Sequence, residues 1–249
     1  MRKKMLYFLL VFIGILTLVS ILLGMLEKKI RKNEFSIFSF TQNVQNALTQ
    51  NPESQNVNTP IVEVFAYSKI PSSILENMIG NSIPDKSVVD TTELSYLTIT
   101  YWGFDEKTHI GEMIVHKDLA QEVLDIFEEV YDQKYPIEKM KLIDEYNAND
   151  ETSMAANNTS AFCYRTVANT NKLSKHSLGK AIDVNPLYNP YVVDTSIMPV
   201  NSESYIDRSI VQKGMIQKGD ALYTAFTKRG WTWGGNWITQ KDYQHFEKK

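Results

Sequence analysis

The chain has 249 residues, of which 43% are hydrophobic, 11% aromatic and 22% charged. This is the composition of a protein that packs a core, so disorder of the whole chain is excluded. Its single cysteine excludes an intrachain disulfide and a multi-thiolate zinc site, so any metal must be held by His and carboxylate groups. The net charge of −3 offers no electrostatic footprint for nucleic acid, and no nucleic-acid partner is expected.

A membrane anchor is expected within residues 1–32. Residues 5–26 carry no charge, and as a helix they would span about 33 Å, enough to cross a hydrocarbon core of about 30 Å. The apolar run exceeds the roughly 7–15 residues of a signal peptide and lacks a following small-x-small cleavage site, so an anchor is favoured over a cleaved signal. Basic residues flank both ends of the run, so they do not fix its orientation.

A polar tether and one folded domain are expected after the anchor. Residues 33–60 are rich in Asn, Gln, Ser and Thr, which is typical of a linker. From residue 61 to residue 249, apolar residues recur at strand and helix spacing. This length is enough for one domain that buries roughly 70% of its unfolded surface. No repeat of 20–50 residues is visible, which excludes solenoids and propellers.

The first predicted elements are a hairpin and a helix. Residues 96–102 and 111–116 are β-branched and aromatic with partial alternation, and the polar segment between them predicts a turn. Apolar residues at helical spacing then predict a helix over 118–133. Asp118, followed three places later by Gln121, resembles a capping box at its start.

The later elements are a second helix and two short strands. Residues 220–229 predict a helix that Gly230 ends. Residues 181–184 and 243–247 predict strands, although each carries His or Asp where a core strand would be apolar. The expected fold class is therefore α+β, a small antiparallel sheet flanked by helices and preceded by one N-terminal transmembrane helix.

Three polar side chains suit a zinc site. His176 lies seven residues before Asp183, and His245 lies on the last predicted strand. Two imidazoles and one carboxylate suit Zn²⁺ and leave one of its four tetrahedral positions for water. By spacing alone, hydrogen-bonded polar residues near strand ends explain the same pattern. The remaining histidines, His109 and His116, lie in and after the hairpin turn and are expected to be solvated or to cap it.

The assembled motifs resemble a known family. SKHSLGKAID at 174–183 has the form S-x-H-x-x-G-x-A-x-D, and W-x-W-G-G-x-W is followed by D-x-x-H-F-E. Together with NNTSAFCYR before the first motif, they resemble the zinc D-alanyl-D-alanine carboxypeptidase family, which includes vancomycin-resistance D,D-dipeptidases and L-alanyl-D-glutamate endopeptidases. The resemblance covers about 62–247. It implies that the zinc site is present and places it on the small sheet.

The resemblance also implies roles for individual residues. His176, Asp183 and His245 would be the zinc ligands, and Asp242 the general base that activates the zinc-bound water. Several relatives have Glu at the position of Asp242, and the alternative is that Asp242 merely caps a turn. Arg165 would face the scissile carbonyl and stabilise the developing oxyanion.

Further residues near the motifs have less defined roles. Ser174 is expected to hydrogen-bond substrate, and Glu247 either orients a ligand histidine or is a surface residue. Cys163 is expected to be a small buried hydrophobe. The tryptophans of the second motif would wall the cleft or pack in the core: Trp231, Trp233 and Trp237.

These observations predict a membrane-anchored zinc metallopeptidase, with its catalytic domain outside the cytoplasm, that hydrolyses peptidoglycan stem peptides. The tether would give it an r.m.s. reach of about 30 Å from the membrane. The bond cut is either D-Ala–D-Ala, as in a carboxypeptidase, or L-Ala–D-Glu, as in an endopeptidase. The alternative is a non-catalytic zinc module that binds cell-wall peptides or another protein. Such a module needs neither a base nor an oxyanion stabiliser, which favours the enzyme.

Overall fold

The computed structural model describes residues 61–84, 89–167 and 170–249. Val64–Lys249 form one compact unit. The predicted membrane anchor and tether lie outside the described residues. Within the described part of the chain, no helix is both long and apolar enough to cross a membrane.

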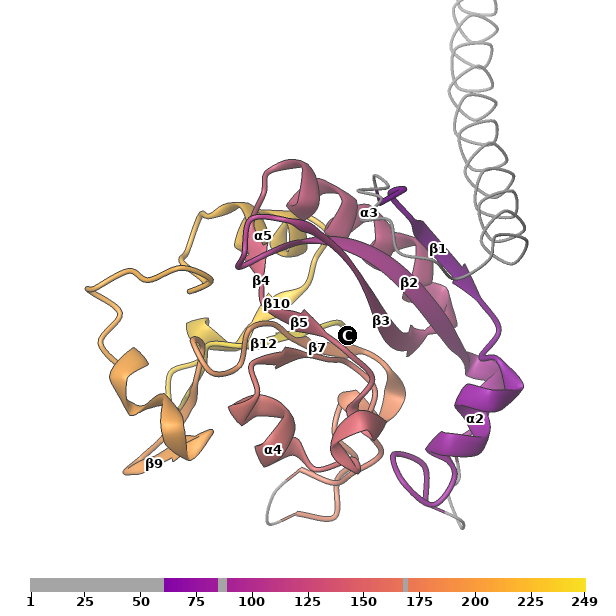
Figure 1. Cartoon of the computed structure of the whole chain (residues 1–249). Helices are drawn as coiled ribbons and strands as arrows, with labels where there is room; N and C mark the ends of the chain where they lie inside the picture. The colour runs from indigo at the N-terminus through magenta and orange to yellow at the C-terminus, as the bar shows by residue number, and fades with distance from the viewer. Residues whose placement is uncertain (1–60, 85–88, 168–169) are drawn as a thin grey trace, which may run out of the picture. The chain divides into compact units, whose positions relative to one another are not determined.

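The described chain contains mostly short strands with a few helices between them (Figure 1). The strands are β1 (Phe65–Ser68), β2 (Leu94–Gly103), β3 (Thr108–His116), β4 (Pro136–Ile137), β5 (Lys139–Met140), β6 (Asn158–Thr159), β7 (Ala181–Asp183), β8 (Tyr191–Val193), β9 (Ser196–Met198), β10 (Thr232–Trp233), β11 (Lys241–Asp242) and β12 (His245–Glu247). The α-helices are α2 (Ser72–Met78), α3 (Ala120–Asp132), α4 (Asp150–Ala155) and α5 (Ala221–Thr227). The expected mixture of helices and antiparallel sheets is confirmed.

The predicted hairpin is present as β2 and β3. The two strands pair antiparallel from Leu94 opposite His116 to Trp102 opposite Thr108, so the polar segment between them forms the turn. β1 pairs antiparallel with β2, and β4 pairs with it in parallel. Alternate apolar residues of β2, among them Leu97 and Ile99, are fully buried. The hairpin therefore supplies one wall of the core.

The predicted helix over 118–133 is α3, preceded by a 3₁₀ turn, η2 (Lys117–Leu119). Its helical spacing gathers one apolar face against the core, made of Val123, Leu124, Ile126, Phe127 and Val130. The chain enters α3 from β3 through η2, so the start of the helix depends on how the strand meets this turn.

The capping box predicted at the start of α3 is wrong. Asp118 lies within η2, and its amide donates to Nδ1 of His116 at 3.3 Å. The side chain of Gln121 instead donates to Asp125 at 2.7 Å. Because β3 runs straight into η2, its last residue supplies the cap. The capping role expected as one possibility for His116 is confirmed.

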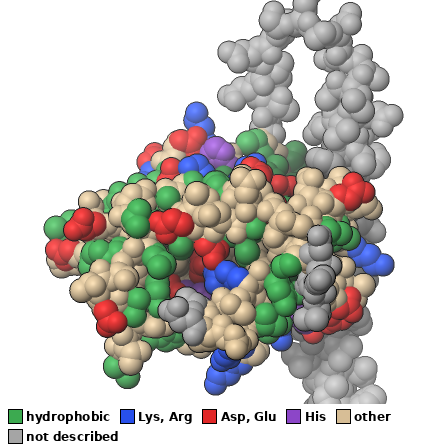
Figure 2. All heavy atoms as spheres, turned by 90° about the horizontal axis from the view of Figure 1, so that it is seen from below, with side chains coloured by type: hydrophobic (Ala, Val, Ile, Leu, Met, Phe, Trp, Pro, Cys, Tyr) green, Lys and Arg blue, Asp and Glu red, His purple; other side chains and the backbone are tan. Residues whose placement is uncertain are grey.

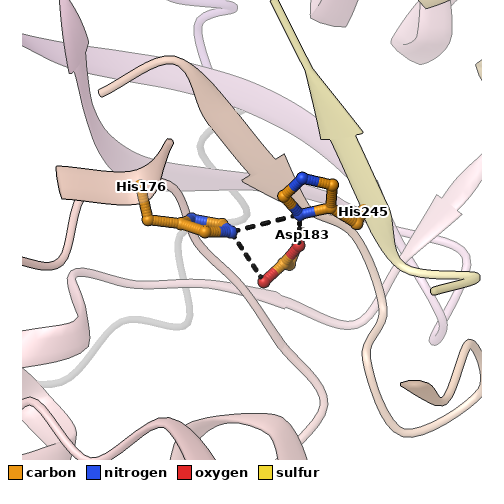
Figure 3. A group of neighbouring side chains, drawn as sticks. All are labelled: His176, Asp183 and His245. Atoms are coloured by element: carbon orange, nitrogen blue, oxygen red, sulfur yellow. Dashed lines mark hydrogen bonds and ion pairs between the residues drawn. The ribbon is translucent and has the colours of Figure 1, made fainter. Parts of the chain in front are cut away.

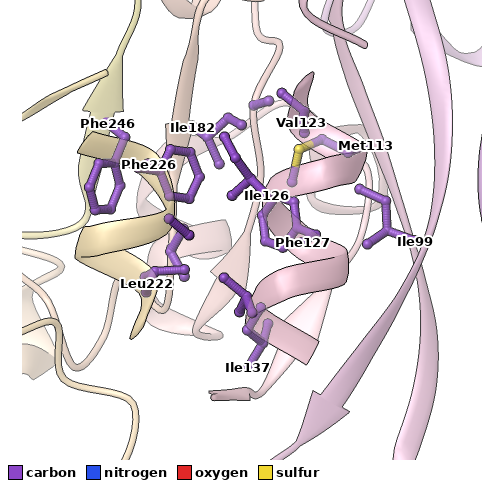
Figure 4. Packing of buried hydrophobic residues seen from close by; sticks show 14 of the residues in the cluster. Ile99, Met113, Val123, Ile126, Phe127, Ile137, Ile182, Leu222, Phe226 and Phe246 are labelled. Carbon is purple, nitrogen blue, oxygen red and sulfur yellow. The ribbon is translucent and has the colours of Figure 1, made fainter. Parts of the chain in front are cut away.

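The core is centred on a group of aromatic side chains (Figure 4). The ring of Phe226 on α5 stacks on Phe246 of β12 at 4.2 Å and meets Phe127 of α3 edge-on at 6.0 Å. The helix α5 forms as predicted, and the carboxylate of Asp220 caps it by accepting from the amide of Tyr223 at 2.7 Å. Phe226 thus joins both helices to the sheet that bears β12.

The strands predicted at 181–184 and 243–247 are β7 and β12, the neighbours in a three-stranded antiparallel sheet with β10. In their register, His245 is opposite Asp183 and Phe246 is opposite Ile182. Phe246 and Ile182 are fully buried in the core. Since side chains alternate between the faces of a strand, the polar pair points to the opposite face.

Replacing Phe226 with Ala should lower the free energy of unfolding by about 3–5 kcal/mol, because it leaves a cavity between α3, α5 and β12. Chemical denaturation of the purified protein measures this change. Ile238, whose side chain is 95% exposed, is the control, and Ile238→Ala should change stability by less than about 0.5 kcal/mol. A loss below about 1 kcal/mol in Phe226→Ala would contradict the central place given to this ring.

Candidate metal centre

Three elements bring His176, Asp183 and His245 together (Figure 3). His176 comes from a 3₁₀ turn, η4 (His176–Leu178), and the other two come from β7 and β12. Nε2 of His176 lies 3.2 Å from Nδ1 of His245 and 3.2 Å from Oδ2 of Asp183. Nδ1 of His245 lies 3.0 Å from Oδ1 of Asp183. All three residues are buried.

The position of His176 depends on Gly179, which ends η4 with φ of +63°. The carbonyl of Gly179 accepts from the amide of His116 at 2.8 Å. A Cβ at Gly179 would lie 2.4 Å from that amide nitrogen, so only glycine allows this approach. The motif glycine therefore attaches the turn that carries His176 to the end of the hairpin.

Neighbouring acceptors orient both imidazoles. Nδ1 of His176 lies 2.6 Å from the carbonyl oxygen of Ala161 and donates to it, which leaves Nε2 with its lone pair facing the cluster. Nε2 of His245 lies 3.4 Å from Glu247, which turns its Nδ1 toward the same point. A carboxylate or carbonyl behind each ligand histidine is the usual outer partner in metal sites. Glu247 thus lies behind His245, as its predicted role in orienting a ligand histidine requires.

The electrostatics of the cluster favour a cation among its ligand atoms. Burial opposes the charge of Asp183, but His176 and His245 outweigh it and hold the pKa of this carboxyl well below its usual range. Burial also opposes a charge on His245, but hydrogen bonds to Asp183 and Glu247 raise its pKa to about 10. At neutral pH a proton on Nδ1 of His245 thus lies among the three ligand atoms.

This donor set fits a zinc ion. One imidazole nitrogen of each histidine and one carboxylate oxygen lie within 4.8 Å of one another, and Zn²⁺ takes such ligands in catalytic sites once the imidazoles are neutral. A divalent cation would replace the single proton that now stabilises Asp183. No histidine other than His176 and His245 joins the cluster within the described ranges. His109 is partly exposed and pairs with Asp105 at 2.8 Å, as expected for a solvated residue.

Asp242 is a buried carboxylate beside the cluster. It lies on β11, which pairs with β8, and its Oδ1 is buried without a hydrogen-bond partner in the described chain. Burial raises its pKa to about 6, against the opposing attraction of His245. Gly234 permits this approach, since a Cβ there would lie 2.8 Å from Cβ of Asp242. A carboxylate with an unused oxygen near ligand histidines is suited to accept a proton.

Arg165 lies next to the turn that carries His176. Its Nη1 is 3.5 Å from Oγ of Ser174, and its Nε forms an ion pair with Asp150. Ser174 is buried, and its hydroxyl also accepts from the amide of His176 at 3.2 Å. Ser174 thus contacts both Arg165 and the backbone of His176, and its predicted hydrogen bond to substrate stays a prediction.

The three tryptophans of the second motif differ in burial. Trp231 and Trp233 are buried in the core, and Trp237 is half-buried with its ring 5.4 Å from that of His245. Cys163 is a buried hydrophobe as predicted, and burial raises the pKa of its thiol to about 12. A thiol of this kind is no nucleophile.

No pattern in the sequence marks Asp150 as a functional residue. It occupies the first turn of α4, where an acidic residue is ordinary and carries no signal of function. Its contact with Arg165, fifteen residues later, exists only because the segment from α4 to Arg165 folds back beside η4.

Zinc uptake at pH 7 should release about one proton, because His245, with a pKa near 10, must lose its proton to bind a metal. Zinc affinity should therefore rise with pH up to about pH 10. Calorimetric titration of the purified protein in buffers of different ionisation enthalpy measures the released proton. His245→Ala should abolish tight binding, and the control His109→Ala should retain it. Uptake without proton release would contradict the charge state assigned to the cluster.

Comparison with known proteins agrees with this geometry. Residues 168–248 match the family model described as D-alanyl-D-alanine carboxypeptidase. Neither curated proteins nor solved structures gave a match. The matched segment contains all three residues of the cluster, and the matched family indicates a zinc peptidase that acts on peptidoglycan. The resemblance predicted from the sequence is thus confirmed for residues 168–248, which are similar to the D-alanyl-D-alanine carboxypeptidase family.

Proposed function

We propose that this protein is a zinc peptidase that hydrolyses peptidoglycan stem peptides outside the cytoplasm, held at the membrane by residues 5–26. The observation that carries the enzymatic proposal is the buried cluster of His176, Asp183 and His245 within the segment that matches the family. The uncharged run at 5–26 supports the anchor, and the location of peptidoglycan beyond the membrane supports the orientation.

The three cluster residues would hold Zn²⁺, which supplies Lewis acidity to water and to the scissile carbonyl. Asp242 would accept the proton of the attacking water through its unpaired Oδ1 and pass it to the leaving amine. Arg165 would donate hydrogen bonds to the carbonyl oxygen as negative charge develops there. Glu247 and the Ala161 carbonyl would keep the ligand histidines in place during this cycle.

Of the two candidate bonds, we place the terminal D-Ala–D-Ala bond first. The matched family model is described by that activity. A carboxypeptidase must also pair the terminal carboxylate of its substrate with a cation. The hydrogen bond with His245 chiefly lowers the pKa of Glu247, and the charges of Lys175 and Lys172 lower it further, so both lysines lie near His245. The L-Ala–D-Glu bond is the second candidate, and the same assay distinguishes it.

The purified protein, loaded with zinc and incubated with muropeptides that carry pentapeptide stems, should release a single D-Ala. Mass spectrometry of the products, with and without a chelator, identifies the bond. Chelator-sensitive cleavage after L-Ala would instead assign the endopeptidase activity. If the zinc-loaded protein binds these muropeptides without cutting them, the chain is a binding module and the proposed function is wrong.

Asp242→Asn should retain zinc and lower kcat by about 10²- to 10⁴-fold, because Asn cannot accept the proton. Asp242→Glu should keep substantial activity, since Glu restores the carboxylate that several relatives use. The control is Asp118→Asn, at a side chain that is 75% exposed, which should leave the rate unchanged. The base is not Asp242 if the Asn variant turns over stem peptide at the original rate.

A further inference from the structure

The backbone of Arg165 is fixed to the turn that carries His176. Its amide donates to Oγ of Ser177 at 2.8 Å, and its carbonyl accepts from that hydroxyl at 2.5 Å. The same carbonyl accepts from the amide of Ser174 at 3.0 Å. These bonds settle where the Arg165 side chain starts. They do not fix the position of its guanidinium, because several rotatable bonds separate the guanidinium from the backbone.

Asp150 supplies the missing constraint. Its Oδ2 forms an ion pair with Nε of Arg165, and each of the two side chains is 35% exposed. On the other side of the guanidinium, Nη1 approaches Ser174 at 3.5 Å. Nη2 has no hydrogen-bond partner among the described residues. The guanidinium is therefore held along one edge, while Nη2 stays available to a ligand.

The carboxylate of Asp150 is itself held firmly. Asn149 caps α4 by accepting from the amide of Thr152 at 2.9 Å, which fixes the turn that contains Asp150. Ser153, one turn later, is buried and accepts from Asn158 at 3.0 Å. The helix therefore presents Asp150 from a fixed support, as a positioning group requires.

The ion pair lies beside the metal ligands. Burial raises the pKa of Asp150, the charges of Arg165 and His176 oppose this rise, and the charge of Asp183 adds to it. Asp150 is thus within electrostatic reach of two residues of the cluster. Figure 2 shows acidic, basic and histidine side chains meeting at one hollow of the surface.

We propose that Asp150 is a positioning residue, which holds Nε of Arg165 so that Nη2 faces the carbonyl oxygen of a bound peptide. The inference rests on the proposed function. Asp150 touches neither substrate nor metal, and it acts through Arg165 alone. Its loss should affect the rate of the chemical step more than the binding of substrate, because the oxyanion develops only in the transition state.

Asp150→Asn keeps the size of the side chain and removes its charge. We expect kcat for stem-peptide hydrolysis to fall about 10- to 100-fold, with KM changed less than about threefold and zinc content unchanged. Asp150→Glu should recover part of the loss, and Asp118→Asn is the matched control. An unchanged kcat in Asp150→Asn would overturn the proposal. A raised kcat would also overturn it, since Asp150 would then compete with substrate for the guanidinium.

A double-mutant cycle separates positioning from a general structural role. In an Arg165→Ala background, Asp150→Asn should cause no further loss of kcat, because the group through which it acts is gone. A further loss of similar size would assign Asp150 a role independent of Arg165 and overturn the proposal.

A spectroscopic readout keeps this test independent of turnover. The Nε resonance of Arg165 in a ¹⁵N–¹H spectrum should shift in Asp150→Asn, because the substitution removes the carboxylate charge beside Nε. If the original protein cuts no stem peptide, the proposed function fails, and this resonance still decides whether Asp150 fixes the guanidinium. A resonance unaffected by Asp150→Asn would overturn the proposal.

Discussion

The pairing of β7 with β12 is the constraint on which the site depends. Its register places Asp183 opposite His245 and, one residue along, Ile182 opposite Phe246. The apolar pair is fully buried against the aromatic core, so a slip by one residue would turn Asp183 or His245 toward the core and an apolar side chain away from it. Packing of the hydrophobic core thus holds Asp183 and His245 at 3.0 Å. Their mutual attraction alone would not do so, because burying two charged groups costs desolvation free energy.

The third residue of the cluster, His176, is fixed by the hairpin and not by this sheet. Gly179 bonds to the amide of His116, so η4 is attached to the strand that leads into α3. The hairpin and α3 pack on the same core as β12. Two separate parts of the fold therefore place His176 and the Asp183–His245 pair. Loosening of either part would change the distances between the side chains of the cluster.

The parts of this structure that the sequence predicts are those with local causes. The hairpin, α3 and α5 are predicted because alternation and helical spacing are visible within one element. The ligand trio is predicted because it falls in a dense motif. The sequence leaves open whether His116 caps a turn, because its bond to the amide of Asp118 in η2 depends on how a strand meets that turn. The ion pair of Asp150 with Arg165 is missed because no pattern in sequence marks a tertiary contact. The anchor and tether stay predictions.

The absence of sulfur from the site has a chemical consequence. All three candidate ligands and the carboxylate of Asp242 offer nitrogen or oxygen atoms, which mild oxidants leave unchanged. Cys163, whose amide bonds to the carbonyl of His176, is buried, and its high thiol pKa keeps it from becoming a reactive thiolate. The centre can therefore keep its ligands in an oxidising compartment, where a thiolate zinc site would be exposed to disulfide formation.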